Sequence, residues 1–176
     1  MARPLLAEAR RGEILDAAFV VFAEHGYHAL STRDLAKELG ATTGVLYHWF
    51  DSKEALFEAM LARQVERQVA EALAALGEVP SEGRMVALGH HIADRGDDLQ
   101  RTLLVALDYH RAHPGAAPLG RALEAYRAAL AGNVGLSEDV ARIVVDLVLG
   151  ELLQRILDPA RSLDVLTRLL PAVARV

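Results

Sequence analysis

The sequence predicts an all-α fold in which an N-terminal three-helix head, containing a helix-turn-helix, is followed by an α-helical body. Two observations support this prediction. Leucine, alanine, arginine and glutamate are prominent among the 176 residues, and all four favour helices. Apolar residues also recur at helical spacing, in segments separated by glycine, proline or serine. A chain of this length can bury a sizeable core.

The composition limits the compartment and the kind of partner. The chain contains no cysteine, which excludes disulfides and thiolate chemistry, and we expect a cytoplasmic protein. We expect no signal peptide and no membrane span, because no apolar stretch is long enough. The formal net charge is −5, and residues 1–53 carry six Lys or Arg against seven Asp or Glu. A strongly basic, nonspecific nucleic-acid binder is therefore not indicated.

A first helix is predicted from about Leu5 or Ala9 to Glu24, with Gly26 at its end. Its apolar stripe contributes to the core of the head. The first ten residues are interpreted as an arm, which either follows phosphates or frays in solvent. The basic residues of this arm are Arg3, Arg10 and Arg11.

Two short helical patterns meet within residues 31–50. Ser31 and Asp34 have capping-box spacing at the start of the first pattern, and Gly40 supplies the left-handed position that ends it. Thr42 is placed to cap the second pattern. This spacing predicts a helix-turn-helix whose second helix can enter a DNA major groove. A plain helical hairpin within an all-α core has the same spacing, so spacing alone leaves both interpretations open.

Specific residues narrow this choice. The pair Leu46-Tyr47, then Phe50, then the string Ser52-Lys53-Glu54-Ala55-Leu56 resemble the DNA-binding domain of the TetR family of transcriptional regulators. The resemblance covers about residues 10–60, and beyond them only helical character and length are similar. It implies a ligand-responsive regulator, in the simplest case a repressor that binds a palindromic operator as a homodimer. A small-molecule effector would release it from the DNA.

The resemblance also implies a DNA-binding domain over residues 1–53 and a regulatory and dimerisation domain over residues 54–176. Thr43 and Val45 are expected at base edges, since the Val45 methyl groups suit a thymine methyl. Hydroxyl groups, cations and helix N-termini are expected at phosphates, with a solvated side chain as the alternative for Arg33. The expected DNA-contacting residues are Thr32, Arg33, Thr42, Thr43, Gly44, Val45, Tyr47, His48 and Lys53.

Ser52 is expected to cap a long helix that continues to about Leu76, before residues 77–83 break the pattern. Since this helix starts in the predicted head and ends in the body, we interpret it as the mechanical link between them. Further helices are expected at about residues 84–94, 97–113, 118–131, 140–157 and 162–173.

The segment 140–157 is apolar around most of its circumference, so more than one side of it must be covered. We expect a two-fold dimer in which it forms a four-helix contact with segment 118–131. Burial inside the monomer is the alternative. Along this helix, Arg142 and Glu151 are expected to pair with the residues four positions later. The expected interface residues are Leu123, Tyr126, Val140, Ile143, Val144, Leu147 and Val148.

An effector pocket is marked less clearly. Several apolar and tyrosine side chains would suit a cavity with a polar handle, although they would serve equally as plain core. They are Met85, Leu88, Leu103, Leu107, Tyr109 and Tyr126. The His/Asp clusters at residues 90–94 and 108–113 raise the possibility of a metal, but exposed helix faces produce the same pattern. We expect neither a metal nor a cofactor.

Two other functional classes have less support. A helical enzyme would need chemistry that the sequence does not offer: it has no Gly-rich phosphate loop, no cysteine nucleophile and no paired Glu-x-x-His motif. A helical protein–protein adaptor with a non-functional DNA-binding head remains the alternative.

Overall fold

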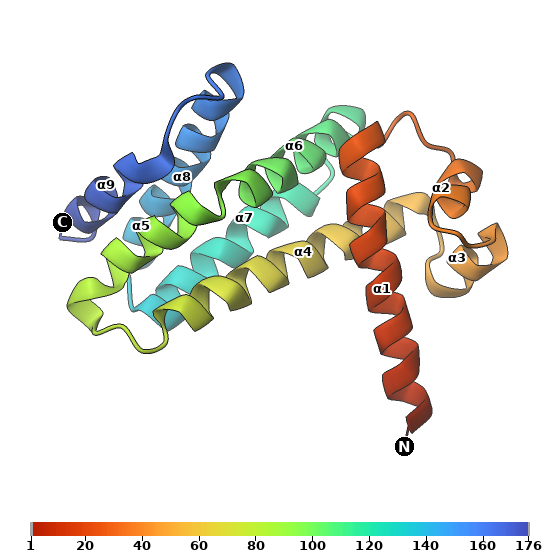
Figure 1. Cartoon of the computed structure of the whole chain (residues 1–176), viewed down its shortest axis with the longest axis horizontal. Coiled ribbons are helices and arrows are strands. Elements are labelled where there is room, and N and C mark those ends of the chain that lie inside the picture. The colour runs from red at the N-terminus through yellow and green to blue at the C-terminus, as the bar shows by residue number, and fades with distance from the viewer. Residues whose placement is uncertain (1, 176) are drawn as a thin grey trace. The chain divides into compact units, whose positions relative to one another are not determined.

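The computed structural model describes residues 2–175, with side chains from residue 9 onward. Within these residues every regular element is a helix, which confirms the predicted all-α fold (Figure 1). The chain forms two compact units. We call residues up to Gln64 together with Leu104–Leu119 the head unit, and Val65–Leu103 together with the residues from Gly120 onward the body unit. The functional division at residue 53 stays a prediction.

The head unit contains three complete helices and large parts of two others. Its core includes the fully buried side chains of Leu15, Phe22, Leu35 and Phe57. The complete helices are α1 (Ala2–His25), α2 (Thr32–Glu38) and α3 (Thr43–Trp49). The other two are the start of α4 (Lys53–Leu76) and the second half of α6 (Gly96–Ala112), so both α4 and α6 continue from one unit into the other.

The predicted N-terminal arm is helical, because α1 begins at Ala2 rather than near residue 5 or 9. The side chain of Arg3 lies outside the described residues. Arg10 forms an exposed ion pair with Glu13 at 3.7 Å. The Arg11 guanidinium lies 5.1 Å from the centre of the Phe50 ring, which ties α1 to the residue that ends α3.

The helix starts in the head follow the predicted capping pattern. Ser31 Oγ accepts from the Asp34 amide at 3.2 Å, and the Asp34 carboxylate accepts from the Ser31 amide at 3.1 Å, which completes a capping box. Thr42 Oγ1 accepts from the Val45 amide at 3.3 Å. Ser52 Oγ accepts from the Ala55 amide at 3.0 Å at the start of α4. The polar residues placed before each apolar segment therefore set where α2, α3 and α4 begin.

The body unit is also helical, and its boundaries lie close to the predicted ones. The helix predicted at residues 118–131 differs at its end, because a π-helical turn at Leu130–Val134 follows α7. Besides parts of α4 and α6, the elements are η1 (Ser81–Gly83), α5 (Arg84–Asp94), α7 (Pro118–Ala129), η2 (Leu130–Val134), α8 (Glu138–Leu157), η3 (Leu163–Val165) and α9 (Leu166–Val173).

Helix α8 is covered on one side only within the protomer. Val144 and Leu152 are buried, whereas Ile143 is 48% exposed and Leu157 is 81% exposed. Full burial inside the monomer, the alternative considered for this helix, is therefore wrong.

The two ion pairs predicted along α8 are wrong as well. Asp146 accepts from Arg127 of α7 at 3.2 Å, and Arg142 pairs with Asp139 at 2.9 Å. Glu151 pairs with Arg161, and Arg155 pairs with Asp97 of α6. Asp146, Glu151 and Arg155 pair with other helices or the following loop, whereas Arg142 pairs within α8 with the residue three positions before it.

Candidate nucleic-acid interface

Helix α3 has one buried face and one open face. Leu46 is 2% exposed, and Phe50, which follows the helix, is 5% exposed, so these residues anchor α3 in the head. Val45 and Tyr47, which flank Leu46 on its two sides around the helix, are 39% and 54% exposed. A helix held by its apolar side with its N-terminal half open to solvent has the form needed to enter a major groove.

Helix α2 packs against α3. Leu35 and Ala36 of α2 are buried, and the Ala41 amide donates to the Ala36 carbonyl at 2.9 Å across the turn. Gly40 has φ +61°, the left-handed conformation that glycine adopts without strain, and it closes α2. The turn between the two helices is therefore fixed by backbone geometry.

The other expected DNA-contacting residues differ in exposure. Arg33, Thr42, Gly44 and His48 are exposed, whereas Thr32 and Thr43 are half-buried. The structure brings these residues to the starts of α2 and α3 and along the open face of α3. Hydrogen bonds from Ser31 hold the pKa of the Asp34 carboxyl below its ordinary value. The Asp34 carboxylate at the start of α2 repels a phosphate, so the phosphate contacts expected there stay predictions for its neighbours Thr32 and Arg33.

Lys53 is engaged inside the head. Its ammonium donates to the Tyr27 carbonyl at 3.0 Å and to the Leu30 carbonyl at 2.8 Å, and it lies 3.9 Å from the centre of the Tyr27 ring. Burial lowers the pKa of Lys53. An ammonium has three N–H donors, so at most one is left for a phosphate. Lys53 thus closes the α1–α2 loop onto α4, and its expected contact with DNA stays a prediction.

Tyr27 makes polar contacts that no local pattern indicates. Its hydroxyl donates to Glu54 Oε1 at 2.7 Å, and its ring packs edge-on against Phe57 and Tyr109, with centroids 5.3 and 4.7 Å away. Burial, then the hydrogen bond to Glu54, raises the pKa of Tyr27. The same bond lowers the pKa of the Glu54 carboxyl. Tyr27 therefore joins the loop before α2 to the first turn of α4.

The expected pocket residues are divided between the two units. Met85, Leu88 and Leu103 are buried in the body unit. Tyr109 belongs to the head unit, where its ring stacks on Phe57 with centroids 4.2 Å apart, and Leu107 belongs to the same unit. Tyr109 is therefore packed in the core of the head, and its place in an effector pocket stays a prediction.

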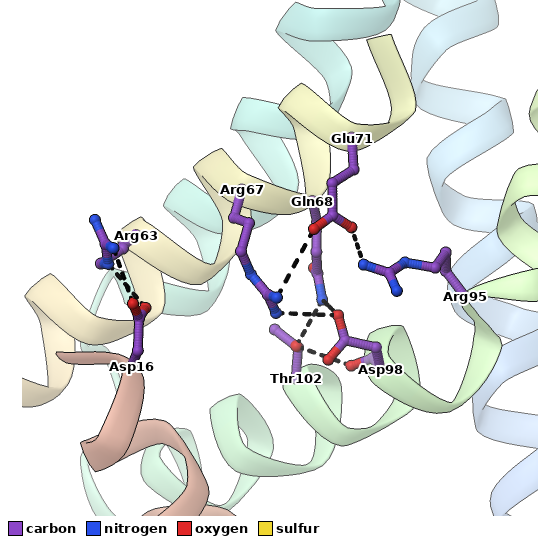
Figure 2. A network of polar contacts seen from close by, with 8 residues as sticks. All are labelled: Asp16, Arg63, Arg67, Gln68, Glu71, Arg95, Asp98 and Thr102. Atoms are coloured by element: carbon purple, nitrogen blue, oxygen red, sulfur yellow. Dashed lines mark hydrogen bonds and ion pairs between the residues drawn. The ribbon is translucent and has the colours of Figure 1, made fainter. Parts of the chain in front are cut away.

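Tyr126 instead joins a polar cluster in the body unit. Its hydroxyl donates to Gln68 Oε1 at 2.5 Å, and the Gln68 amide donates to Thr102 Oγ1 at 2.9 Å and to Asp98 Oδ2 at 3.0 Å. Figure 2 shows the part of this cluster made by α4 and α6, together with Arg67. Burial raises the pKa of Tyr126. No sequence signal distinguished Gln68 and Thr102 from surface residues, although both are buried.

Two kinds of feature are absent from the described residues. Among the described residues, no three His, Asp or Glu side chains lie together in a way that could hold a metal ion. None of the helices in this part of the chain is long and apolar enough to cross a membrane.

Comparison with known proteins identifies the head. Residues 14–60 match the family model of bacterial regulatory proteins of the tetR family. Residues 14–60 are therefore a domain of the TetR-family type. The predicted resemblance is thereby confirmed. The TetR-family relatives include the HTH-type transcriptional regulator UidR of Escherichia coli K12, 41% identical over 64 residues, which are 36% of this chain and 33% of UidR. The HTH-type transcriptional repressor AcnR of Corynebacterium diphtheriae is 42% identical over 78 residues, 44% of this chain and 40% of AcnR.

The matched segment thus spans about a third of the TetR-family relatives' length. Solved structures show a similarity in fold that extends beyond this segment. A putative transcriptional regulator from Pseudomonas aeruginosa PAO1 superposes with a TM-score of 0.77 at 22% identity, covering 96% of this chain and 90% of that one. The multidrug binding protein EbrR complexed with malachite green gives 0.74 at 22% identity, covering 95% and 99%. The whole chain therefore has the fold of these proteins, a helix-turn-helix head with a helical body.

Proposed function

We propose that this TetR-family chain is a ligand-responsive transcriptional regulator, in the simplest case a repressor that binds a palindromic operator as a homodimer. The open N-terminal half of α3, anchored by Leu46 and Phe50, is the observation that carries this proposal. UidR and AcnR, which share the head, are named as a regulator and a repressor. Such a protein acts in the cytoplasm, where its operator is.

The proposed contacts follow from the exposure of each side chain. Thr43 and Val45 read base edges, because they lie in the first turn of α3, where the helix would meet the groove. Tyr47 and His48 bind flanking phosphates, as do Thr32 and Arg33 at the start of α2. Thr42 caps α3, and Gly44 lets the DNA backbone come close. Because the head has no excess of positive charge, we expect a modest salt dependence of binding.

Dimerisation through α7 and α8 would place two heads about a dyad. The exposed Ile143 and the half-buried Val140 and Leu147 lie on one face of α8 at helical spacing. Leu123 and Tyr126 of α7 and Val148 of α8 are half-buried and complete the proposed interface. Val144 is 1% exposed in its own protomer, so we do not include it in the proposed interface.

The effector is proposed to bind in the body unit. EbrR, whose fold this chain shares, is described as a multidrug binding protein and was solved with malachite green. In the present chain, the body unit combines buried apolar residues such as Met85, Leu88 and Leu103 with the buried Gln68 amide and the hydroxyl of the half-buried Tyr126. An effector releases DNA only if it binds the DNA-free form more tightly than the DNA-bound form.

The test is a mobility-shift titration with the DNA upstream of the chain's own gene. We expect the wild type to shift this DNA, and we expect Thr43→Ala and Tyr47→Ala to weaken binding by about tenfold or more, as loss of a good DNA contact does. Val86→Ala is the matched control, since Val86 is 39% exposed but lies on α5. A folded wild-type dimer that shifts no DNA at low salt would refute the proposal and favour the adaptor alternative.

A further inference from the structure

The end of α1 is capped by a residue from a distant part of the chain. Gly26, with φ +79°, ends the helix, and its amide donates to the Phe22 carbonyl at 2.9 Å. The next amide, that of Tyr27, donates to Asp108 Oδ2 of α6 at 2.8 Å, across 81 residues. A Cβ at Gly26 would stand 3.2 Å from the same oxygen. The α1–α2 loop is therefore shaped around the Asp108 carboxylate.

Tyr27 also contacts the start of α4, and it lies shortly before α2 in the chain. Its carbonyl accepts from Lys53, and its hydroxyl donates to Glu54, both in the first turn of α4. Four residues after Tyr27, Ser31 caps α2. The position of Asp108 thus constrains the loop from which α2 starts, and α2 in turn supports α3.

Helix α6 runs without a break from the body unit into the head unit. In the body unit, Thr102 and Asp98 of α6 bind Gln68, and Asp98 also pairs with Arg67 (Figure 2). In the head unit, the same helix carries Asp108. An effector that rearranges the polar cluster around Gln68 would act on α6 directly, and a hydrogen bond of 2.8 Å weakens steeply with small displacements.

We propose that Asp108 is a positioning residue that couples the body unit to the DNA-reading head through the amide of Tyr27. This inference rests on the proposed function. It adds a route through α6 to the link through α4 that the sequence indicates. Asp108 touches no DNA in this scheme, and its effect is transmitted through the loop that precedes α2.

The coupling can be tested without knowing the effector, because linkage is reciprocal. A duplex that the wild type selects from a random library is the probe, and amide hydrogen exchange is the readout. In the wild type, this duplex slows exchange in α3 and, by about fivefold or more, in residues 96–103 of α6. Asp108→Ala still binds the duplex and protects α3, but loses the protection in residues 96–103.

Two variants separate coupling from general stability. Asp108→Asn keeps an oxygen that accepts the Tyr27 amide, so we expect it to restore the protection of residues 96–103. Asp16→Ala removes another carboxylate of the head unit, which accepts hydrogen bonds from the Arg63 guanidinium at 2.8 and 2.9 Å. This variant should keep the protection of residues 96–103. If Asp108→Ala does not fold, Asp108→Glu serves instead. It displaces the carboxylate by one methylene and should also lose the protection of residues 96–103.

The outcomes are distinguishable. A wild type that selects no duplex removes the proposed function and this inference with it. In the other case, the wild type binds DNA while folded Asp108→Ala or Asp108→Glu protects residues 96–103 as the wild type does. That result overturns the role of Asp108 and leaves the proposed function standing.

Discussion

Gly89 of α5 lies directly against the backbone of Thr167 in α9. A Cβ at position 89 would stand 2.7 Å from the Thr167 Cα and 2.9 Å from its amide nitrogen. Backbone atoms cannot swing aside as the end of a flexible side chain can. This glycine therefore permits the close packing of α5 on α9, which also buries Leu88, Ile92 and Leu166.

Gly89→Ala is accordingly expected to destabilise the protein. Alanine favours a helix by about 1 kcal/mol over glycine, but the overpacking costs about 1–3 kcal/mol and outweighs that gain in this contact. Urea unfolding followed by circular dichroism measures the difference. Gly120→Ala is the control, because a Cβ there meets nothing within 4 Å. Equal stabilisation by both substitutions would contradict this account of the packing.

Tyr27→Phe is expected to cost about 0.5–1 kcal/mol of unfolding free energy, since it removes one hydrogen bond to a largely solvated carboxylate. The Tyr27 hydroxyl lowers the pKa of Glu54, so its stabilising effect is full above the ordinary carboxyl range and is lost as the pH falls through the pKa of the folded state. The deficit of the variant should therefore be present near neutral pH and shrink in acid.

Unfolding free energies measured from neutral to acidic pH check this sign. Tyr47→Phe is the matched control, because the Tyr47 ring is exposed on α3 and should add no such pH-dependent difference. A deficit for Tyr27→Phe that grows in acid would be inconsistent with the bond to Glu54.

Local features of the head were predictable from sequence. The capping bonds of Ser31, Thr42 and Ser52 lie within three residues of their partners, so spacing alone indicates them. The inward positions of Leu46 and Phe50 follow from helical periodicity and from the family resemblance. In these places local propensity and the global fold agree, which is why a single sequence suffices.

Contacts between distant segments were not predictable. The bond between Tyr27 and Asp108 joins positions 81 residues apart, and nothing near either residue indicates the other. Tyr109 was assigned to a pocket because it looks amphipathic on a helix, and only the fold shows that it stacks on Phe57. The partners of the α8 charges were missed for the same reason, since tertiary neighbours replace the expected helical ones.

His91 gives a second pH dependence of the unfolding free energy. It arises from the burial of a base, whereas that of Glu54 arises from a hydrogen bond to a carboxylate. Burial, then repulsion by Arg95, lowers the pKa of His91, against the attraction of Glu71 and Asp94. Below about pH 6.5 the unfolded chain therefore binds the proton more readily than the folded chain does, so stability falls as the pH decreases through that window.

His91→Gln, which cannot take up the proton, should flatten this part of the profile. Unfolding free energies of both proteins at about pH 7.5 and about pH 5.5 test it, and the wild type should lose more than the variant between them. His90→Gln is the control, because His90 is exposed on the same helix. Equal losses in the wild type and His91→Gln would show that His91 does not titrate in this way.

The exposed face of α8 supplies the last prediction. Ile143 is 48% exposed, at the centre of the proposed interface, and a charge placed there would have to be buried when two copies associate. Ile143→Asp should therefore shift the protein towards monomer in sedimentation equilibrium, with the helical content retained. It should also weaken operator binding, because a lone head reads only one half-site. Val20→Asp is the matched control, since Val20 is 49% exposed but lies on α1, outside the proposed interface. If Ile143→Asp remains dimeric at concentrations where the wild type is dimeric, α8 does not form the interface, and the spacing of the two heads must be set by another surface.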